Sequence, residues 1–322
     1  MERGVVPERK SCRGPSRNAD RTGTNMSMWG LRLMFAAAMV FACAATAAEI
    51  HLTDDSGRAV TLKQPARRIV SLAPHITELL FAAGAGARVV GTTSYSDYPA
   101  AAKRIPRIGD SAELDLEQII ALQPDLIVVW QQGSGQRQLD KLLQLGIPVF
   151  YSEPRRLSDI ARSLEQFGML ADTEAVALPA AHAFAARVAA LRARYASRPP
   201  VSVFYQIWRK PLMTINGDQI ISDVIRLCGG KNVFANLKPL VPNISTEAVL
   251  AMDPEVIFGS STDSSSQDPL QNWKKWPHLK AVARDNLFAI QSDLIARPTP
   301  RVLLGAQQVC EDLELARSRR PR

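Results

Sequence analysis

From residue 68 onward, the chain alternates short apolar runs with longer segments in which apolar residues recur every three or four positions. Short apolar runs are typical of buried strands, and the periodic segments are typical of amphipathic helices. The pattern therefore predicts an α/β fold with largely parallel sheets. Strands are expected at residues 69–72, 89–92, 126–130, 149–151 and 201–205, and helices at residues 77–83, 116–122 and 136–145, with another beginning at Ser158.

Residues 174–195 differ from the rest, because they are rich in alanine and arginine and contain a single proline near their start. Phe184, Val188 and Leu191 recur at helical spacing, so we expect one helix of about 30 Å at about 1.5 Å per residue. Pro199-Pro200 ends it. The helix separates two stretches of similar length, which we interpret as an N-terminal lobe (48–172), an interdomain helix (173–198) and a C-terminal lobe (199–316).

The two lobes repeat each other in sequence. Glu117-Gln-Ile-Ile-Ala-Leu-Gln-Pro124 is matched by Glu247-Ala-Val-Leu-Ala-Met-Asp-Pro254, with the same spacing from glutamate to proline. Residues 78–84 likewise correspond to residues 223–229. Two similar lobes that face each other create a cleft, and clefts between domains are favoured ligand sites.

Composition bounds the class of protein. The 322 residues are 46% hydrophobic and 22% charged, with four cysteines and a formal net charge of +8. The length allows one large or two moderate domains. Wholesale disorder and a disulfide-dense miniprotein are both excluded by these numbers.

The positive charge lies at the two ends of the chain. Residues 1–47 carry seven basic and three acidic side chains, residues 317–322 carry four arginines, and residues 48–316 hold 28 basic and 28 acidic side chains. The folded body is therefore neutral, which removes the main support for nucleic-acid binding. We expect the basic tail, residues 317–322, to be solvated and mobile.

The N-terminal region contains a secretion signal. Residues 33–47 form an uncharged apolar run that follows a basic residue and ends in Ala45-Thr46-Ala47. This arrangement is typical of a signal peptide, and the run is shorter than the roughly 20 residues of a membrane span. An uncleaved N-terminal anchor is the alternative. Residues 1–25 are polar and without pattern, so we interpret them as a non-native or untranslated leader and residues 26–47, starting at Met26 or Met28, as the signal peptide.

The cysteines point to an oxidising compartment. The residues before Cys43 match a lipoprotein cleavage site poorly, because Phe41 stands two positions before it, and we do not expect a lipid anchor. Signal cleavage leaves Cys228 and Cys310. We expect a disulfide between them, closing a loop that contributes about 4–5 kcal/mol in the chain-entropy model. Two buried free thiols are the alternative.

Catalytic signatures are scarce. The sequence has no nucleophile elbow, no Walker A loop and no zinc-protease motif, and its four histidines lack metal-ligand spacing. His75 lies at a strand-to-helix junction, where it can line the cleft. An enzyme with Asp293 or Glu153 as general base is the distant alternative, because neither has a nucleophile or cofactor loop beside it. We therefore do not expect an enzyme.

Aromatic residues at strand ends are better candidates for function. Trp130 ends an apolar strand just before a polar loop, and Tyr95 follows another strand in the same way. Open α/β sheets bind ligands at the carboxyl ends of their strands, and such side chains offer a flat apolar surface to a large ring system. Core packing is an equally good interpretation for Trp130 alone.

Several motifs together carry a specific resemblance. They are, in order, Arg68-Ile-Val-Ser-Leu-Ala-Pro-His-Ile-Thr-Glu78, Ser94-Tyr-Ser-Asp-Tyr-Pro99, Leu116-Glu117 through Pro124-Asp125-Leu126-Ile-Val-Val-Trp130, Cys228-Gly-Gly-Lys-Asn-Val-Phe234 and Pro300-Arg-Val-Leu-Leu-Gly-Ala-Gln-Gln-Val-Cys310. With these segments, the chain resembles the periplasmic vitamin B12-binding proteins of ABC importers over residues 67–315. The wider family, whose lobes are joined by a rigid interdomain helix, also includes iron-siderophore and haem carriers.

The resemblance implies a fold of two Rossmann-like lobes joined by one long α-helix, the class III periplasmic-binding-protein fold. It implies that a corrinoid is carried as transported ligand, without a cofactor or metal, by a monomer that delivers it to an inner-membrane ABC permease dimer with its ATPase subunits. It also implies that Cys228 pairs with Cys310. The ligand-binding residues that it implies are Tyr95 and Trp130 on the N-terminal wall and Asp293, Leu294, Ile295, Ala296 and Arg297 on the C-terminal wall.

The repeated glutamates acquire a role from the same resemblance. Glu117 and Glu247, one per lobe, are similar to the pair that engages arginines on two permease subunits, and two matching carboxylates suit a symmetric partner. Stabilisation of helix N-termini is the alternative. The chain departs from the family's pocket by having Ser111, Met213 and Val241 in place of aromatics, with Trp208 nearby. A ferric siderophore or haem is therefore the alternative ligand.

Overall fold

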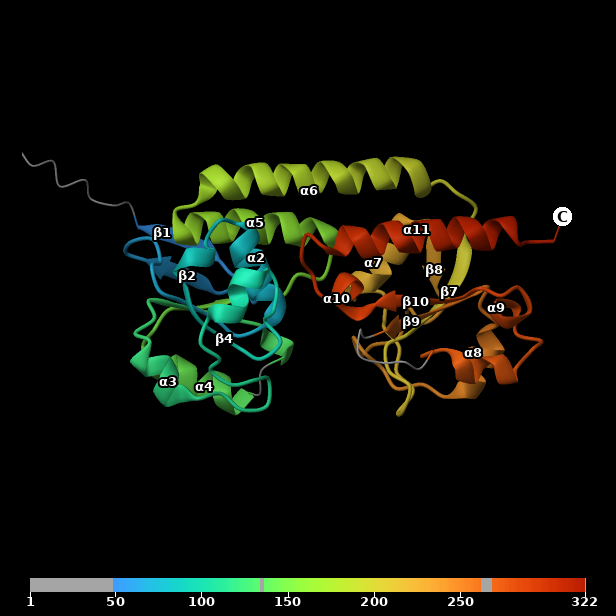
Figure 1. Ribbon diagram of the computed structural model, residues 1–322, viewed down its shortest axis with the longest axis horizontal. Coiled ribbons are helices and arrows are strands. Elements are labelled where there is room, and N and C mark those ends of the chain that lie inside the picture. The colour runs from blue at the N-terminus through green and yellow to red at the C-terminus, as the bar shows by residue number, and fades with distance from the viewer. Residues whose placement is uncertain (1–48, 134–135, 262–267, 322) are drawn as a thin grey trace, which may run out of the picture. The chain divides into compact units, whose positions relative to one another are not determined.

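The computed structural model describes residues 49–133, 136–261 and 268–321. The leader at 1–25, the signal peptide at 26–47 and Cys43 lie outside these residues. The described chain folds into two α/β lobes with parallel sheets, joined by one long helix, as the sequence predicts (Figure 1). The fold class is confirmed.

The N-terminal lobe is built on a parallel sheet whose strands have the order β4-β3-β5-β6. An antiparallel pair, β1 and β2, precedes this sheet and was not predicted from the sequence. The strands of the lobe are β1 (Ile50–Thr53), β2 (Ala59–Leu62), β3 (Ile69–Ser71), β4 (Val89–Thr92), β5 (Leu126–Val129) and β6 (Val149–Tyr151). Its helices are α2 (Pro74–Ala82), α3 (Leu116–Ala121), α4 (Gln136–Gln144) and α5 (Leu157–Ala171).

The C-terminal lobe repeats this topology. Its parallel sheet has the order β8-β7-β9-β10, so in both lobes the second strand flanks the first and the third and fourth follow on the other side. The internal repeat predicted from the sequence is confirmed. The strands are β7 (Val201–Gln206), β8 (Gly230–Asn232), β9 (Val256–Ser261) and β10 (Leu287–Gln291), and the helices are α7 (Ile220–Leu227), α8 (Thr246–Met252), α9 (Lys280–Ala283), α10 (Ser292–Ile295) and α11 (Val302–Ser318).

The central strands are buried on both faces, which explains their continuous apolar runs. In β5, Leu126 and Val128 belong to one hydrophobic cluster and Ile127 and Val129 to another, because successive side chains point to opposite faces of the sheet. The C-terminal sheet is divided in the same way. Helices α3 and α8 pack on corresponding faces of the two sheets, opposite the faces covered by α2, α5, α7 and α11.

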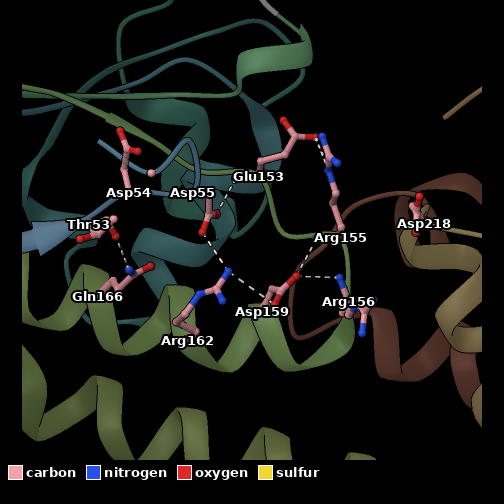
Figure 2. Close-up of a pocket in the computed structure, with 11 residues that line it drawn as sticks. Thr53, Asp54, Asp55, Glu153, Arg155, Arg156, Asp159, Arg162, Gln166 and Asp218 are labelled. Atoms are coloured by element: carbon pink, nitrogen blue, oxygen red, sulfur yellow. Dashed lines mark hydrogen bonds and ion pairs between the residues drawn. The ribbon is translucent and has the colours of Figure 1, made fainter. Parts of the chain in front are cut away.

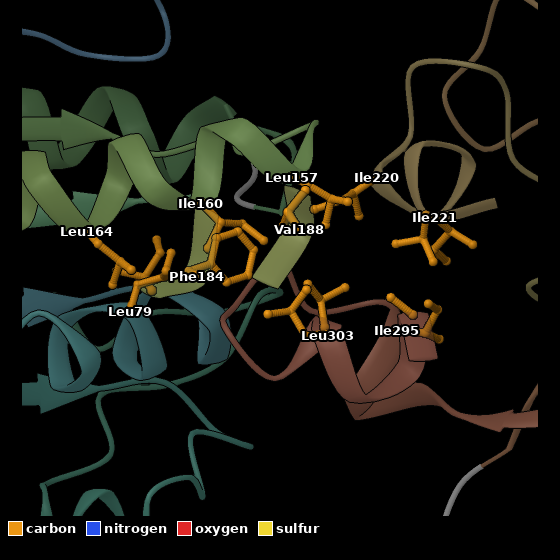
Figure 3. Close-up of a cluster of buried hydrophobic side chains, with 14 of the residues drawn as sticks. Leu79, Leu157, Ile160, Leu164, Phe184, Val188, Ile220, Ile221, Ile295 and Leu303 are labelled. Carbon is orange, nitrogen blue, oxygen red and sulfur yellow. The ribbon is translucent and has the colours of Figure 1, made fainter. Parts of the chain in front are cut away.

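Helix α6 (Glu174–Tyr195) connects the lobes and packs along α5. It is long and apolar enough to cross a membrane by length and composition, yet Phe184 and Val188 are buried in the core of the folded body. One apolar cluster runs through both lobes: Figure 3 shows Leu79 and Ile160 from the N-terminal lobe in the same cluster as Ile221 and Leu303 from the C-terminal lobe. This continuous core limits how far the lobes can separate without exposing apolar surface.

Cys228 and Cys310 form a disulfide across a separation of 82 residues. The bond joins the end of α7 to the middle of α11, and both cysteines are fully buried. The pairing expected from the sequence is confirmed, and the alternative of two free thiols is wrong.

The basic tail was expected to be solvated and mobile, and this expectation is wrong. Helix α11 extends to Ser318, and Arg317 donates hydrogen bonds to the carbonyls of Pro199 and Cys228. Arg320 donates to both carboxylate oxygens of Glu255, at 2.8 and 2.9 Å. The arginines therefore tie the C-terminus to the body, because exposed carbonyls and a carboxylate at the ends of strands lie within their reach.

Candidate ligand-binding site

A cavity of about 300 Å³ lies between the lobes. Its N-terminal wall includes His75, Trp130 and Glu153, and its C-terminal wall includes Asp293 and Arg297. These residues stand at or just after the carboxyl ends of strands β3, β5, β6 and β10, which is where parallel sheets present ligand sites. The cleft predicted from the repeated lobes is therefore present in the structure.

Trp130 is held in a fixed orientation on the N-terminal wall. Its indole donates a hydrogen bond to the Glu153 carboxylate, and its ring lies edge to face against His75 with the centroids 5.3 Å apart. A Cβ atom at Gly133 would lie 1.9 Å from the indole, so only glycine fits behind it. Trp130 also packs against the shared core. Trp130 therefore contributes both to the packing of the core and to the wall of the cavity.

Glu153 serves this arrangement as a structural partner. Burial raises the pKa of its carboxyl group, although the hydrogen bonds from Trp130 and the Gln132 amide oppose the shift. The backbone amide of Glu153 donates to Asp55 at 2.7 Å. The position of Glu153 is thus fixed both by strand β6, which it follows, and by the loop between β1 and β2. Its carboxylate orients the Trp130 ring.

His75 is the second residue of helix α2 and is only 5% exposed. Burial, aided by the positive charge of Arg297, lowers the pKa of its imidazole to about 3. The ring is therefore neutral at physiological pH, and its Nε2 atom has no hydrogen-bond partner among the described residues. His75 lines the cavity, in keeping with its position at a strand-to-helix junction.

Fewer residues of the segment 293–297 line the C-terminal wall than the sequence predicts. Asp293, Ala296 and Arg297 line the cavity, whereas Leu294 is half-buried outside the lining. The resemblance places Ile295 on this wall, but its side chain is fully buried in the shared core and does not line the cavity. The reason is geometric: the short helix α10 turns one face to the cavity and the opposite face to the sheet.

A buried ion-pair network bridges the two lobes beside the cavity. The Glu78 carboxylate, on α2 and 3% exposed, lies 3.0 Å from Arg297 Nη1 and 2.6 Å from Arg301 Nη2. The Arg301 guanidinium also lies 4.0 Å from the centroid of the Tyr98 ring. Burial alone would lower the pKa of Arg301, but the hydrogen bond and charge of Glu78 outweigh it and raise the pKa. We name these four residues the interlobe bridge.

Sequence reasoning missed the interlobe bridge, although one signal was present. Glu78 stands in the apolar run Ile76-Thr77-Glu78-Leu79-Leu80, at the start of the helix expected over residues 77–83. A carboxylate at a buried position requires a cationic or hydrogen-bonding partner. The sequence could not identify the partner, because Arg301 is 223 residues away along the chain.

A larger pocket of about 800 Å³ adjoins the cavity and shares Glu153 and Arg155 with it (Figure 2). Its charged groups are largely engaged with one another: Arg162 lies 2.9 Å from Asp55 and 3.5 Å from Asp159. The charged groups of this pocket therefore serve to hold α5 against the loop that joins β1 to β2. Its polar lining contrasts with the aromatic wall of the interlobe cavity.

A third cavity of about 600 Å³ lies in the C-terminal lobe and shares Ser292 and Ala296 with the interlobe cavity. Trp208, Arg209 and Lys210 line it. Trp208 is 62% exposed. The two cavities thus adjoin along helix α10 and extend the candidate site into the C-terminal lobe.

Known proteins resemble this chain over most of its length. The family model described as "Periplasmic binding protein" matches residues 69–294. The chain belongs to the periplasmic binding protein family. The vitamin B12-binding protein of Vibrio cholerae is 40% identical over 256 residues, covering 78% of this chain and 91% of that protein. That of Vibrio parahaemolyticus is 38% identical over 258 residues, covering 80% and 93%.

Solved structures of periplasmic binding proteins also resemble the fold of this chain. The periplasmic vitamin B12-binding protein BtuF of Vibrio cholerae has a TM-score of 0.73 at 39% identity, covering 79% of this chain and 98% of that one. The periplasmic haem-binding protein RhuT from Roseiflexus has a TM-score of 0.62 at 22% identity and shows the fold alone. The resemblance found in the sequence is confirmed.

The remaining predicted residues of this periplasmic binding protein lie outside the interlobe cavity. Tyr95 follows β4 in a left-handed conformation, with φ at 65°, and is 73% exposed. Glu117 and Glu247 are exposed and occupy the second position of α3 and α8. Backbone and Ser245 hydrogen bonds lower the pKa of Glu247. Equivalent placement on two repeated helices fits both helix stabilisation and contact with a symmetric partner.

Proposed function

We propose that the protein captures a corrinoid, vitamin B12 or a close analogue, between its lobes in the periplasm and delivers it to an ABC permease. One observation carries this proposal: the rigidly held Trp130 faces Asp293, Ala296 and Arg297 across a cavity at the ends of the parallel strands. A flat aromatic wall with few polar groups suits a large amphipathic ring.

The names of the relatives support the same ligand. Proteins named vitamin B12-binding protein match this chain at about 40% identity over more than nine tenths of their own length. A corrinoid is larger than the interlobe cavity of about 300 Å³, so we infer that the ligand also occupies the adjoining cavity that contains Trp208.

Isothermal titration of the mature protein with cyanocobalamin tests the proposal. We expect one site with a dissociation constant in the micromolar range or tighter. Trp130→Ala should weaken binding by about tenfold or more, because truncating an aromatic anchor in the cavity wall removes a large contact. Leu304→Ala, at an exposed apolar position on α11, is the matched control. Absence of binding by the unaltered protein at tens of micromolar would refute the proposal.

Tyr95 is proposed as a further contact at the mouth of the site, because its side chain is the most exposed of the large apolar residues described. Tyr95→Ala should weaken cyanocobalamin binding less than Trp130→Ala does. An unchanged affinity would remove Tyr95 from the site. Haem and a ferric hydroxamate, titrated in the same way, test the alternative ligands.

We propose that Glu117 and Glu247 dock the protein on the two permease subunits, in keeping with their exposed, equivalent positions. The double variant Glu117→Lys/Glu247→Lys should abolish corrinoid uptake by cells while leaving the affinity for cyanocobalamin unchanged. Glu113→Lys, at another exposed glutamate, is the control. A loss of affinity in the double variant would contradict the docking role.

We further propose that residues 26–47 direct export and are removed, and that the mature protein acts as a monomer. N-terminal sequencing of protein purified from the periplasm should then begin near Ala48. Light scattering of the mature protein should give the mass of one chain. A retained apolar run or a dimer mass would contradict the respective proposal.

A further inference from the structure

The C-terminal lobe carries a rigid loop at the carboxyl end of β7, which we name the 208–213 hairpin. The Ile207 amide donates to the Met213 carbonyl at 3.0 Å, and the Met213 amide donates to the Trp208 carbonyl at the same distance. A neighbouring segment braces it, because the Ile244 amide donates to the Leu212 carbonyl at 3.0 Å. The tip of the hairpin is thus presented from a fixed backbone.

Trp208 offers a flat apolar face at the base of this hairpin, where it pairs with Met213. Its Nε1 atom donates to the Lys210 carbonyl at 2.9 Å, so the polar atom of the indole is already satisfied within the hairpin. The ring is nevertheless 62% exposed and lines the cavity of about 600 Å³. An exposed aromatic ring whose hydrogen bond is already formed is suited to stacking against another ring.

Two cations stand beside this ring. Arg209 and Lys210 line the same cavity and form no ion pair with a described residue. The nearby acids are paired elsewhere: Asp268 lies 3.4 Å from Lys274, and Asp293 lies 3.0 Å from Arg297. Among the described residues, no acid therefore compensates the positive charge of Arg209 and Lys210, although residues 48–316 are neutral as a whole.

An aromatic face beside two cations is complementary to a heteroaromatic ring joined to an anionic group. A complete corrinoid carries such a unit, since its nucleotide end consists of a flat base, a ribose and a phosphodiester with one negative charge. Cobinamide has the same corrin ring but lacks the base, the ribose and the phosphodiester. The two ligands therefore differ in the part that the hairpin would contact.

We propose that the 208–213 hairpin is a specificity subsite for the nucleotide end of a complete corrinoid, with Trp208 against the base and Arg209 and Lys210 against the phosphodiester. This inference rests on the proposed corrinoid-binding function. The shared lining at Ser292 and Ala296 allows one ligand to reach both the subsite and the interlobe cavity. The hairpin would then distinguish complete from incomplete corrinoids.

Titrations with cyanocobalamin and dicyanocobinamide test the subsite. The unaltered protein should bind cyanocobalamin at least tenfold more tightly. Arg209→Gln/Lys210→Gln should weaken cyanocobalamin binding by about tenfold, as expected for lost charge-assisted contacts, and change dicyanocobinamide binding less than twofold. The affinity of the unaltered protein for cyanocobalamin should also fall as NaCl rises, and the variant should lose much of this dependence.

Matched variants keep the test falsifiable. Arg187→Gln/Arg192→Gln removes the same charge from the exposed face of α6 and should leave both affinities unchanged. Trp208→Ala should weaken cyanocobalamin binding selectively, and Trp208→Phe should restore most of it, while thermal melting confirms that each variant is folded. The subsite would be overturned if Arg209→Gln/Lys210→Gln lost affinity for both ligands to the same extent, or for neither ligand.

The two proposals fail differently. If the unaltered protein binds neither corrinoid, the proposed function is wrong. If it binds both with the same affinity, the corrinoid-binding function stands and the subsite is wrong.

Discussion

The interlobe bridge allows a quantitative test of how the two lobes are held together. Glu78→Gln keeps the shape of the side chain but removes the charge that faces Arg297 and Arg301, at 3.0 and 2.6 Å. Glu78 is almost fully buried, so the substitution leaves two guanidinium groups without their anion in a largely dry environment. The bridge joins α2 of one lobe to the α10–α11 region of the other.

The expected cost follows from the geometry. Opposite charges 4 Å apart attract by about 4 kcal/mol at an effective dielectric constant of about 20, and removing one partner of a buried pair costs about 3–5 kcal/mol. The side chains of Arg297 and Arg301 are 18% and 19% exposed, so water screens part of this energy. Glutamine also retains one acceptor. We therefore expect a loss of about 2–3 kcal/mol in unfolding free energy.

Urea denaturation followed by circular dichroism measures this loss, and a double-mutant cycle with Arg301→Gln isolates the pair. The cycle should give a coupling energy of about 1.5–3 kcal/mol, and the melting temperature should fall by roughly 5–10 °C. Glu113→Gln, at an exposed carboxylate, is the matched control and should cost less than about 0.5 kcal/mol. A coupling below about 0.5 kcal/mol would show that Glu78 and Arg301 do not hold the lobes together.

Three further predictions concern α11. Reducing the Cys228–Cys310 disulfide should lower the unfolding free energy by about 4–5 kcal/mol in urea titrations, and a thiol assay on unreduced protein should detect no free thiol. Deleting residues 319–322 should cost about 1–3 kcal/mol, because the bidentate contact of Arg320 with Glu255 is lost; an unchanged urea midpoint would contradict this anchoring. Burial, with the charge of Glu311, raises the pKa of Asp312 to about 6, so the ionised form opposes folding. Protonation of Asp312 therefore stabilises the folded state. This contribution is complete below about pH 4 and is lost as the pH rises through about 6. Asp312→Asn should therefore stabilise the protein by roughly 1 kcal/mol at pH 7.5, a value discounted because the group is partly exposed, and have little effect at pH 4; equal melting temperatures at pH 7.5 would contradict the shift.

Some of the site was predictable because local pattern and topology determine it. Trp130 ends a buried strand and is followed by a polar loop, and any parallel sheet places such a residue at its ligand-binding edge. The repeated segments at Glu117 and Glu247 likewise predicted equivalent helices, since the same residue pattern folds in the same way in each lobe. These features need no knowledge of distant contacts.

Other features depend on contacts between distant parts of the chain. Arg317 and Arg320 look like a solvated tail in the sequence, but they reach carbonyl groups at Pro199 and Pro200 and the Glu255 carboxylate, which only the folded lobe brings together. Ile295 belongs to a segment that contains residues of the cavity wall, and its position on α10 turns it toward the core instead. The pairing of Glu78 with arginines of the other lobe has the same origin.

The position of these contacts bears on ligand release. Helices α3 and α8, which carry Glu117 and Glu247, pack on the sheet faces opposite the core that the two lobes share. In Figure 1 both lie at the ends of their lobes farthest from α6. A partner that binds both glutamates and moves them apart would therefore separate the two lobes at the interlobe bridge and at the shared core. Because opening there exposes apolar surface and breaks a buried ion pair, wide spontaneous opening is costly. If the proposed docking role of the glutamates holds, we expect the energy for release to come largely from the partner.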